Sequence, residues 1–212
     1  MLNKILDIFF PPSCVICGKI GKMWICPKCN IQLKQELNFY KIKKDGSTIY
    51  FISFYEGLVR ELLLSFKFRE QAYISSFLAE TISKKIEFAH TIKNYDYIIP
   101  VPMYITNKKI RGYNQAELIA HKLGKTMEVN DLTDYLVKIK KNQKQSRLNG
   151  QKRIENVKNV YEIKSETLIK EKKILLVDDI YTTGSTVNAC IKELKKAKPK
   201  QIDILVIAKT IL

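Results

Sequence analysis

The sequence predicts an α/β fold, with a twisted, mostly parallel sheet flanked by helices and preceded by a small N-terminal module. Three observations support this prediction. After residue 40, short apolar segments alternate with helical patterns, which is typical of βαβ units. Near the N-terminus, four cysteines stand in two closely spaced pairs. The chain has 212 residues, 46% of them hydrophobic, which suffices for one domain of roughly 150–200 residues plus a module.

The composition excludes several classes of protein. The chain is too apolar for a disordered or collagenous protein, and no window reaches the ~18–20 uninterrupted apolar residues of a membrane span. Lysine and arginine number 37 against 21 acidic residues, a formal net charge of +16. This charge has two interpretations. In the first, it serves a polyanionic partner such as nucleic acid, a phosphorylated substrate or anionic lipid. In the second, it reflects only a composition rich in lysine, since nearly all of the positive charge is lysine and arginine is scarce.

The N-terminal module is predicted to span residues 1–40, and the main domain residues 41–212. The module opens with an apolar segment at residues 1–10, followed by Pro11 and Pro12. This segment is either a helix docked on the protein's own core or a short interfacial membrane anchor. It does not have the pattern of a secretory signal peptide, which favours a cytoplasmic location. Peripheral contact of the protein with the inner face of the cytoplasmic membrane is a further alternative.

The cysteine pairs Cys14–Cys17 and Cys26–Cys29 form a strong zinc signature. Each C-x-x-C pair presents two thiolates from one tight turn, and two such turns complete a tetrahedron with Zn–S bonds of ~2.3 Å. Four thiolates leave no open position for a substrate, so the single predicted zinc ion is structural. A disulfide pair or a redox motif is the alternative, although a cytoplasmic location disfavours disulfides. Cys190 stands apart and is predicted to be a small buried core residue.

The main domain is predicted to alternate strands and helices in the order of a doubly covered parallel sheet. Residues 41–47 form a polar connection, and residues 138–158 a basic stretch with little structure. Strands are expected at residues 49–55, 95–101, 135–139, 173–178 and 203–208. Helices are expected at residues 31–40, 58–68, 72–89, 114–127 and 185–196.

Residues 174–186 contain the clearest chemical signal. Four apolar residues predict a buried parallel strand, and Asp178 and Asp179 follow at its carboxyl end, where open α/β sheets bind ligands. A Thr-Thr-Gly-Ser-Thr run then opens a helix, so that backbone N–H groups and the helix N-terminus can surround a phosphate. An acidic pair beside a phosphate cradle suits a ligand with ribose hydroxyls and a terminal phosphate. Taken singly, these fragments also occur as ordinary caps and turns.

This segment resembles, position for position, the phosphoribosyl-pyrophosphate motif of type I phosphoribosyltransferases. The resemblance implies that Asp178 and Asp179 are the catalytic pair and hold the ribose 2′- and 3′-hydroxyls, directly or through Mg²⁺. It also implies that the strand at residues 95–101 leads into a pyrophosphate-facing loop at residues 102–112. The residues that would cradle the 5′-phosphate are Tyr181, Thr182, Thr183, Gly184, Ser185 and Thr186.

The pyrophosphate-facing loop is basic. Arg111 is the best candidate for binding pyrophosphate, because its planar fork grips phosphate oxygens bidentately, and Lys109 and Lys108 stand beside it. The alternative is a solvated basic loop. Asn114 and Gln115 are then candidates to cap or orient this loop.

The chain as a whole resembles the ComF family of competence proteins, which carry a four-cysteine module ahead of such a domain. Three further strings carry this resemblance: Tyr55-Glu56-Gly57…Arg60-Glu61-Leu62…Lys67-Phe68, Pro100-Val101-Pro102…Arg111-Gly112-Tyr113-Asn114-Gln115, and Gln145…Leu148…Arg153…Asn156. The resemblance implies a protein that assists DNA uptake in natural transformation. Such a protein would bind phosphoribosyl pyrophosphate and single-stranded DNA, with proteins of the competence machinery as further partners.

Two other functions compete with this one. A catalytic phosphoribosyltransferase of nucleotide or base salvage would release Mg²⁺-bound pyrophosphate. A nucleic-acid-binding protein could instead keep the phosphate cradle without catalysis. No segment can be assigned to the hood that grips a base in salvage enzymes, and a zinc module is foreign to them. The basic stretch at residues 138–158 suits a lid over a phosphorylated ligand, a track for a nucleic-acid backbone or a plain exposed segment.

Overall fold

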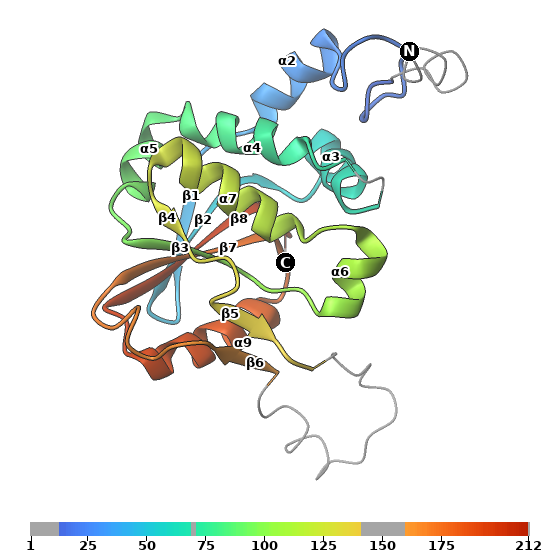
Figure 1. Cartoon of the computed structure of the whole chain (residues 1–212). Helices are drawn as coiled ribbons and strands as arrows, with labels where there is room; N and C mark the ends of the chain where they lie inside the picture. The colour runs from blue at the N-terminus through green and yellow to red at the C-terminus, as the bar shows by residue number, and fades with distance from the viewer. Residues whose placement is uncertain (1–12, 69–70, 141–159, 212) are drawn as a thin grey trace.

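The computed structural model describes residues 13–68, 71–140 and 160–211, and its centre is a twisted six-stranded sheet of order β1-β2-β8-β7-β3-β4 (Figure 1). All neighbouring strands run parallel except β1 and β2, which are antiparallel. The strands of this sheet are β1 (Tyr40–Lys44), β2 (Ser47–Phe54), β3 (Tyr97–Pro100), β4 (Asn130–Asp131), β7 (Lys173–Tyr181) and β8 (Gln201–Lys209). The predicted α/β class with a mostly parallel sheet is confirmed.

Strands β7 and β8 lie at the centre because their side chains are apolar on both faces. Every residue from 202 to 208 in β8 is buried, including Asp203, and residues 174–177 of β7 are buried as well. Asp203 is accommodated because its carboxylate accepts hydrogen bonds from the Thr48 backbone N–H at 2.7 Å and the Tyr95 hydroxyl at 2.5 Å. A parallel strand covered on both faces has this uninterrupted apolar pattern.

Helices cover the sheet from both sides, with two buried apolar clusters between (Figure 1). On one face α7 packs against β3 and β7, and α4 packs against α7. On the other face lie α9 and a separate two-stranded sheet of β5 and β6. The helices are α2 (Pro27–Glu36), α3 (Gly57–Phe68), α4 (Ile74–Ser83), α5 (Ile86–Ile92), α6 (Ile105–Arg111), α7 (Gln115–Met127), α9 (Ser185–Leu194) and the 3-10 turn η2 (Lys195–Ala197). The small sheet pairs β5 (Leu136–Lys138) with β6 (Tyr161–Ile163).

The cysteine module packs on α3 and α4 and shares their core. Val15 and Leu33 of the module belong to the same buried cluster as Leu62 of α3. The Ser65 hydroxyl of α3 donates to the Val15 carbonyl at 3.0 Å. On the outside, the Trp24 ring stacks on Tyr73, with ring centroids 4.9 Å apart.

Two predictions about the elements are wrong. Residues 41–47 are not a plain connection, because most of them form strand β1 and a tight turn into β2. Asp45 and Gly46, both with positive φ (51° and 81°), make the turn, and an Asp-Gly pair between two strands favours this kind of hairpin. Residues 72–89 are not one helix, because Lys85 has an extended backbone (φ −87°, ψ 109°) and separates α4 from α5.

Other boundaries shift in a way that bears on the sites. The helix predicted at residues 31–40 begins and ends earlier: α2 starts at Pro27, immediately after Cys26, and stops at Glu36, while Tyr40 already belongs to β1. The loop predicted at residues 102–112 contains helix α6. The apolar segment at residues 1–10 lies outside the described residues. Residues 141–159 of the basic stretch, which include the family string from Gln145 to Asn156, lie outside them as well. No helix among the described residues is long and apolar enough to cross a membrane.

Candidate functional site

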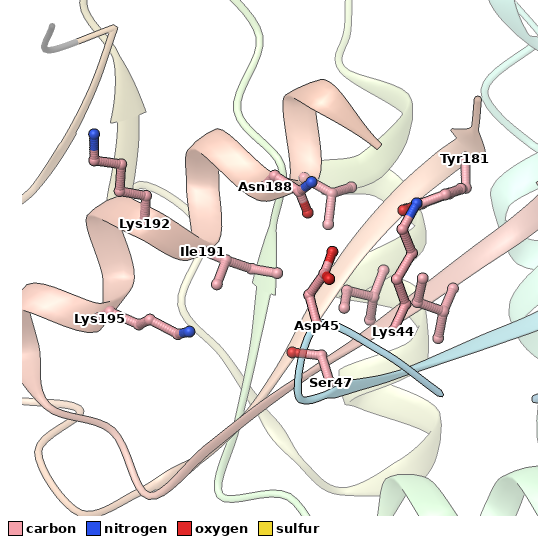
Figure 2. A pocket seen from close by; sticks show the side chains of 11 residues that line it. Lys44, Asp45, Ser47, Tyr181, Asn188, Ile191, Lys192 and Lys195 are labelled. Carbon is pink, nitrogen blue, oxygen red and sulfur yellow. The ribbon is translucent and has the colours of Figure 1, made fainter. Parts of the chain in front are cut away.

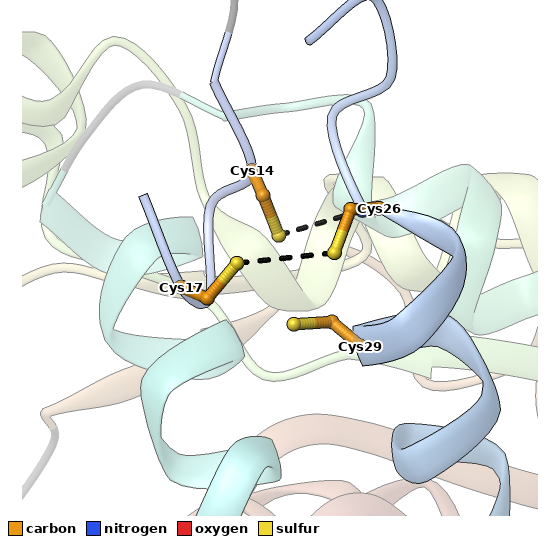
Figure 3. Close-up of side chains that lie close together, drawn as sticks. All are labelled: Cys14, Cys17, Cys26 and Cys29. Carbon is orange, nitrogen blue, oxygen red and sulfur yellow. Dashed lines mark hydrogen bonds between the residues drawn. The ribbon is translucent and has the colours of Figure 1, made fainter. Parts of the chain in front are cut away.

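The two C-x-x-C pairs come together at one point of the module (Figure 3). The first pair lies on a turn in which Gly18 (φ 72°) donates its backbone N–H to the Cys14 carbonyl at 2.8 Å. The second pair lies at the start of α2, where Cys26 is the N-cap residue and Cys29 stands in the first turn. All four Sγ atoms lie within 4.8 Å of one another, and none of the cysteines forms a disulfide.

This cluster fits a tetrahedral metal ion. Zn–S bonds of ~2.3 Å give a tetrahedron whose edges are ~3.8 Å. The Sγ atoms of Cys17 and Cys26 are 3.8 Å apart. Burial acts to raise the pKa of the Cys14 thiol, but backbone hydrogen bonds, including that of Cys26, outweigh it and lower this pKa to about 6. Burial and the neighbouring thiols raise the pKa of Cys29, whose proton a metal would have to displace.

The acidic pair lies within strand β7, which runs three residues beyond the predicted end of the strand and stays paired with β8 as far as Tyr181. Each carboxylate accepts the next backbone N–H, Asp178 from Asp179 at 2.9 Å and Asp179 from Ile180 at 2.8 Å. The two carboxyl groups stay close to each other, because both the charge and the side chain of Asp179 act on Asp178. Both are partly buried at the carboxyl edge of the sheet.

Asp178 lies on the α9 face, in an environment of low polarity. Burial, and next the charge of Asp179, raise the pKa of Asp178 well above its usual range, while Lys138 of β5 opposes this shift. Burial lowers the pKa of Lys138, and its Nζ lies 5.5 Å from the centre of the Tyr161 ring of β6. The sequence marked Lys138 only as the start of a basic stretch. Its approach to Asp178 depends on where the β5–β6 hairpin packs, which no local motif reveals.

The loop after β7 turns sharply into α9. Gly184 is the N-cap of α9 with φ 80°, and a Cβ at this position would lie 2.2 Å from the Tyr181 hydroxyl. Thr182, Thr183 and Ser185 are exposed around the turn, and the Ser185 backbone N–H donates to the Thr183 hydroxyl at 3.4 Å. The exposed hydroxyls and the free N–H groups at the start of α9 form an anion-binding arrangement.

Tyr181 and Thr186 differ from the other predicted cradle residues. The Tyr181 side chain is buried beneath the loop, whereas Thr186 is partly buried in the first turn of α9. Tyr181 therefore supports the loop with its side chain, whose hydroxyl lies against Gly184. Cys190, one helical turn further along α9, is fully buried, as predicted for a core residue.

Behind the loop lies a cavity of about 360 Å³ between α9 and the β1–β2 hairpin (Figure 2). Its floor is apolar and includes Ile49 and Ile204. Lys44 reaches over it toward Tyr181, with Nζ 5.8 Å from the centre of the ring. The cavity thus adjoins the back of the loop and does not open between the acidic pair and α6.

Helix α6 carries the basic residues predicted to face pyrophosphate. The segment leading to it starts beside β7, because the Val101 backbone N–H donates to the Val177 carbonyl at 2.8 Å. Arg111 is partly buried, and its Nη1 donates to the Gln115 Oε1 at 2.8 Å. Lys109 is exposed, whereas Lys108 forms an ion pair with Glu117 at 2.5 Å. Lys109 and Arg111 are therefore the cations of α6 that remain available for an anion.

Asn114 and Gln115 order this region, as the sequence suggested. The Asn114 side chain caps α7 by accepting the Ala116 backbone N–H at 3.1 Å, and it donates to the Val101 carbonyl at 3.0 Å. Gln115 fixes Arg111 from the same helix end. The structure thus places the acidic pair, the Thr-Thr-Gly-Ser-Thr loop and the segment leading to α6 at one edge of the sheet. The four cysteines form a separate cluster in the module on α3 and α4.

Comparisons with known proteins agree with this architecture. Residues 110–210 match the model of the phosphoribosyl transferase domain, so the main domain has the type I phosphoribosyltransferase fold that the sequence predicted. Competence protein F of Haemophilus influenzae is 30% identical over 92% of this chain and 96% of its own length. Competence protein ComFC of Bacillus subtilis is 25% identical over 87% and 73%, and DNA utilization protein YhgH of Escherichia coli O6:H1 is 22% identical over 82% and 80%. The chain therefore belongs to the ComF family of competence proteins.

Proposed function

We propose that this protein acts in the uptake of DNA during natural transformation, through a domain that binds phosphoribosyl pyrophosphate or a related ribose phosphate. The observation that carries the ligand assignment is the order of chemical groups from the end of β7 to the start of α9. Asp178 and Asp179 follow the buried residues of β7 and are partly buried, and Gly184 then caps α9 with no room for a side chain. The names of the relatives, competence and DNA utilization proteins, support the cellular role.

Each part of this edge suits a different part of the ligand. The hydroxyls of Thr182, Thr183 and Ser185 and the N–H groups at the start of α9 would hold the 5′-phosphate. The carboxylates of Asp178 and Asp179 would accept the ribose hydroxyls. Carboxylate oxygens are also the ligands that Mg²⁺ prefers, and Mg²⁺ would neutralise charge on the pyrophosphate oxygens. Lys109 and Arg111 would bind the pyrophosphate from α6.

Zinc has a different task in this proposal. Cys14, Cys17, Cys26 and Cys29 would hold one ion, which would cross-link the first turn of the module to the start of α2. Four sulfur ligands complete the coordination of the ion, so its contribution is to the folding of the module and not to chemistry at the sheet edge.

Single-stranded DNA is the second partner that we propose. The net charge of +16 supports a polyanion as partner, and lysine and arginine supply the attraction to the phosphate backbone. We place the protein in the cytoplasm, next to proteins of the competence machinery, with peripheral contact to the membrane as part of the same proposal. These partners would be reached by surfaces outside the loop between β7 and α9.

Calorimetric titration of phosphoribosyl pyrophosphate with Mg²⁺ tests the ligand site. The double variant Asp178→Asn/Asp179→Asn is expected to lose most of the affinity of the parent protein. Asp134→Asn is the control for the chemical change itself, since it makes one Asp-to-Asn replacement at an exposed position. Unchanged affinity in the double variant would refute the assignment of the site.

A catalytic phosphoribosyltransferase of nucleotide or base salvage is the second candidate function. The observation that favours it is Arg111, which Gln115 holds in place at the start of α7, where a leaving pyrophosphate would need a fixed cation. Pyrophosphate release, measured across a panel of bases and nucleotides, distinguishes turnover from binding alone. Release that depends on one acceptor and disappears in Asp179→Asn would establish catalysis.

A further inference from the structure

Phe68, the last residue of α3, exposes 67% of its surface although α3 is otherwise amphipathic with a buried apolar face. Two cations flank its ring. The Lys67 Nζ lies 5.2 Å from the centre of the ring, and the Arg111 Cζ of α6 lies 6.0 Å from it. The ring is thus an exposed flat surface with positive charge contributed by two different helices.

The position of this ring relative to α6 is fixed by contacts around the Phe66 carbonyl. That carbonyl accepts the Tyr113 hydroxyl at 2.5 Å and the Gln115 side-chain amide at 3.3 Å. The Tyr113 ring also stacks on the Phe66 ring, with centroids 5.6 Å apart. Since Gln115 also binds Arg111, the end of α3 and the junction of α6 and α7 form one connected unit.

The surrounding surface is basic and partly apolar. Helix α6 has no buried residue, and Ile110 on it exposes 79% of its surface. Lys109 is exposed, and none of Lys67, Lys109 and Arg111 forms an ion pair with an acidic side chain in the part of the chain that the structure describes. Three cations without an acidic partner among the described residues therefore surround an exposed aromatic ring.

An exposed aromatic ring between cations fits single-stranded nucleic acid. The bases of a single strand are free to stack on a side chain, whereas those of a duplex are already stacked, and the phosphates pair with lysine and arginine. We propose that Lys67, Phe68, Lys109 and Arg111 form a binding surface for single-stranded DNA, with Phe68 as a stacking platform for one base. The proposal rests on the DNA-binding part of the proposed function and names the surface responsible.

Fluorescence anisotropy of labelled oligo(dT) with the full-length protein tests this proposal. Stacking contributes ~1–3 kcal/mol per base, so Phe68→Ala is expected to weaken binding by about 5- to 150-fold, and Phe68→Trp to retain it. Phe68→Ala removes no charge, so the slope of log affinity against log salt should not change. Lys67→Ala should instead lower that slope by ~0.7, the value for one phosphate of a single strand.

Two controls separate stacking from other effects. An abasic oligonucleotide has phosphates but no bases, so the parent protein and Phe68→Ala are expected to bind it equally. Leu168→Ala removes another exposed apolar side chain, 43% exposed, at a site far along the chain, and should bind oligo(dT) as the parent does. Phosphoribosyl pyrophosphate should bind Phe68→Ala unchanged.

The outcomes distinguish failure of the surface from failure of the function. If the parent protein binds oligo(dT) and Phe68→Ala binds it equally well, the stacking platform is refuted and the DNA role stands. The platform would also be refuted if Phe68→Ala weakened binding of the abasic strand as much as binding of oligo(dT). The same holds if Phe68→Ala weakened binding of phosphoribosyl pyrophosphate and not of oligo(dT). If the parent protein does not bind oligo(dT), the DNA-binding part of the proposed function fails together with this surface.

Discussion

The carboxylate of Glu36 caps helix α3 by accepting the Leu58 backbone N–H, with 3.1 Å between Oε2 and N. The same oxygen accepts the Val59 N–H at 3.3 Å. Glu36 is the last residue of α2, the helix that begins at the second cysteine pair, whereas α3 follows strand β2 of the main sheet. A carboxylate at this place satisfies two free N–H groups and interacts favourably with the helix dipole. The cysteine module is therefore joined to the main domain by a helix cap as well as by the shared core.

We expect Glu36→Ala to lower the free energy of unfolding by about 1–2 kcal/mol, the usual effect of losing a helix cap. Glu36→Gln keeps one acceptor oxygen without the charge and should lose less. Urea unfolding followed by circular dichroism measures both variants. Glu61→Ala, which removes an exposed glutamate paired with Arg60 on α3 itself, should change stability by less than ~0.5 kcal/mol. Equal effects of Glu36→Ala and Glu61→Ala would contradict the importance of the cap.

Trp24 reports whether the cysteine module is folded. It is the single tryptophan of the chain, and its ring stacks on Tyr73 at the start of α4. Because folding of a small metal module is coupled to metal binding, Cys29→Ser or a chelator should release this contact and shift the Trp24 emission to longer wavelength.

The matched control for this experiment is the remaining cysteine. Cys190→Ala also removes a buried thiol, but from α9, and should leave the Trp24 emission and one bound zinc ion per chain intact. Native mass spectrometry counts the ion. A protein that holds no zinc after gentle purification, or a Cys29→Ser protein that keeps it, would count against the site.

Sequence reasoning predicted best those features that a few neighbouring residues determine. The strand–turn–helix at residues 174–186 and the two C-x-x-C pairs each depend on local spacing, and both lie where the sequence placed them. The hairpin of β1 was missed because its exposed lysines hide an edge strand, although Asp45 and Gly46 were a usable turn signal. The break at Lys85 has no comparable signal in the sequence.

Contacts between distant segments could not be predicted. Glu36 over Leu58 and Lys138 near Asp178 each bring together elements whose relative position depends on the packing of the entire domain. Gln115 was expected to orient the basic loop, but its bond to the Phe66 carbonyl became visible only in the folded chain. The cysteine cluster and the strand–turn–helix were therefore readable from the sequence, whereas the contacts that hold them in place were not.

Gly184 and Gly46 provide a matched pair for the loop between β7 and α9. Their φ values are 80° and 81°, so an alanine is strained equally at both, by ~1–2 kcal/mol. A Cβ at Gly46 meets open space, whereas at Gly184 it would collide with Tyr181. Gly184→Ala should therefore destabilise the protein more than Gly46→Ala and abolish binding of ribose 5-phosphate in calorimetry. If both variants bind this ligand equally, the tight turn is not part of the phosphate site.

Asp178 makes the stability of the protein depend on pH in a defined direction. Burial, and next the charge of Asp179, raise its pKa in the folded state, whereas the unfolded chain has the ordinary value. The folded state therefore binds this proton more tightly. The contribution of Asp178 to stability is complete below the ordinary carboxyl pKa and is lost as pH rises through the raised folded pKa.

Asp178→Asn cannot ionise and should escape this loss. We expect it to be more stable than the parent protein at about pH 7 and to converge with it near about pH 3, below the ordinary carboxyl pKa. Urea unfolding across this range measures the difference, with Asp134→Asn as an exposed control that should follow the parent curve. The same Asp178→Asn variant should bind phosphoribosyl pyrophosphate more weakly, because the neutral amide cannot replace the carboxylate toward Mg²⁺ and the ribose hydroxyls. A gain in stability together with a loss of binding would mean that Asp178 is kept at this buried position for the ligand, whereas a loss of both would make it a structural residue.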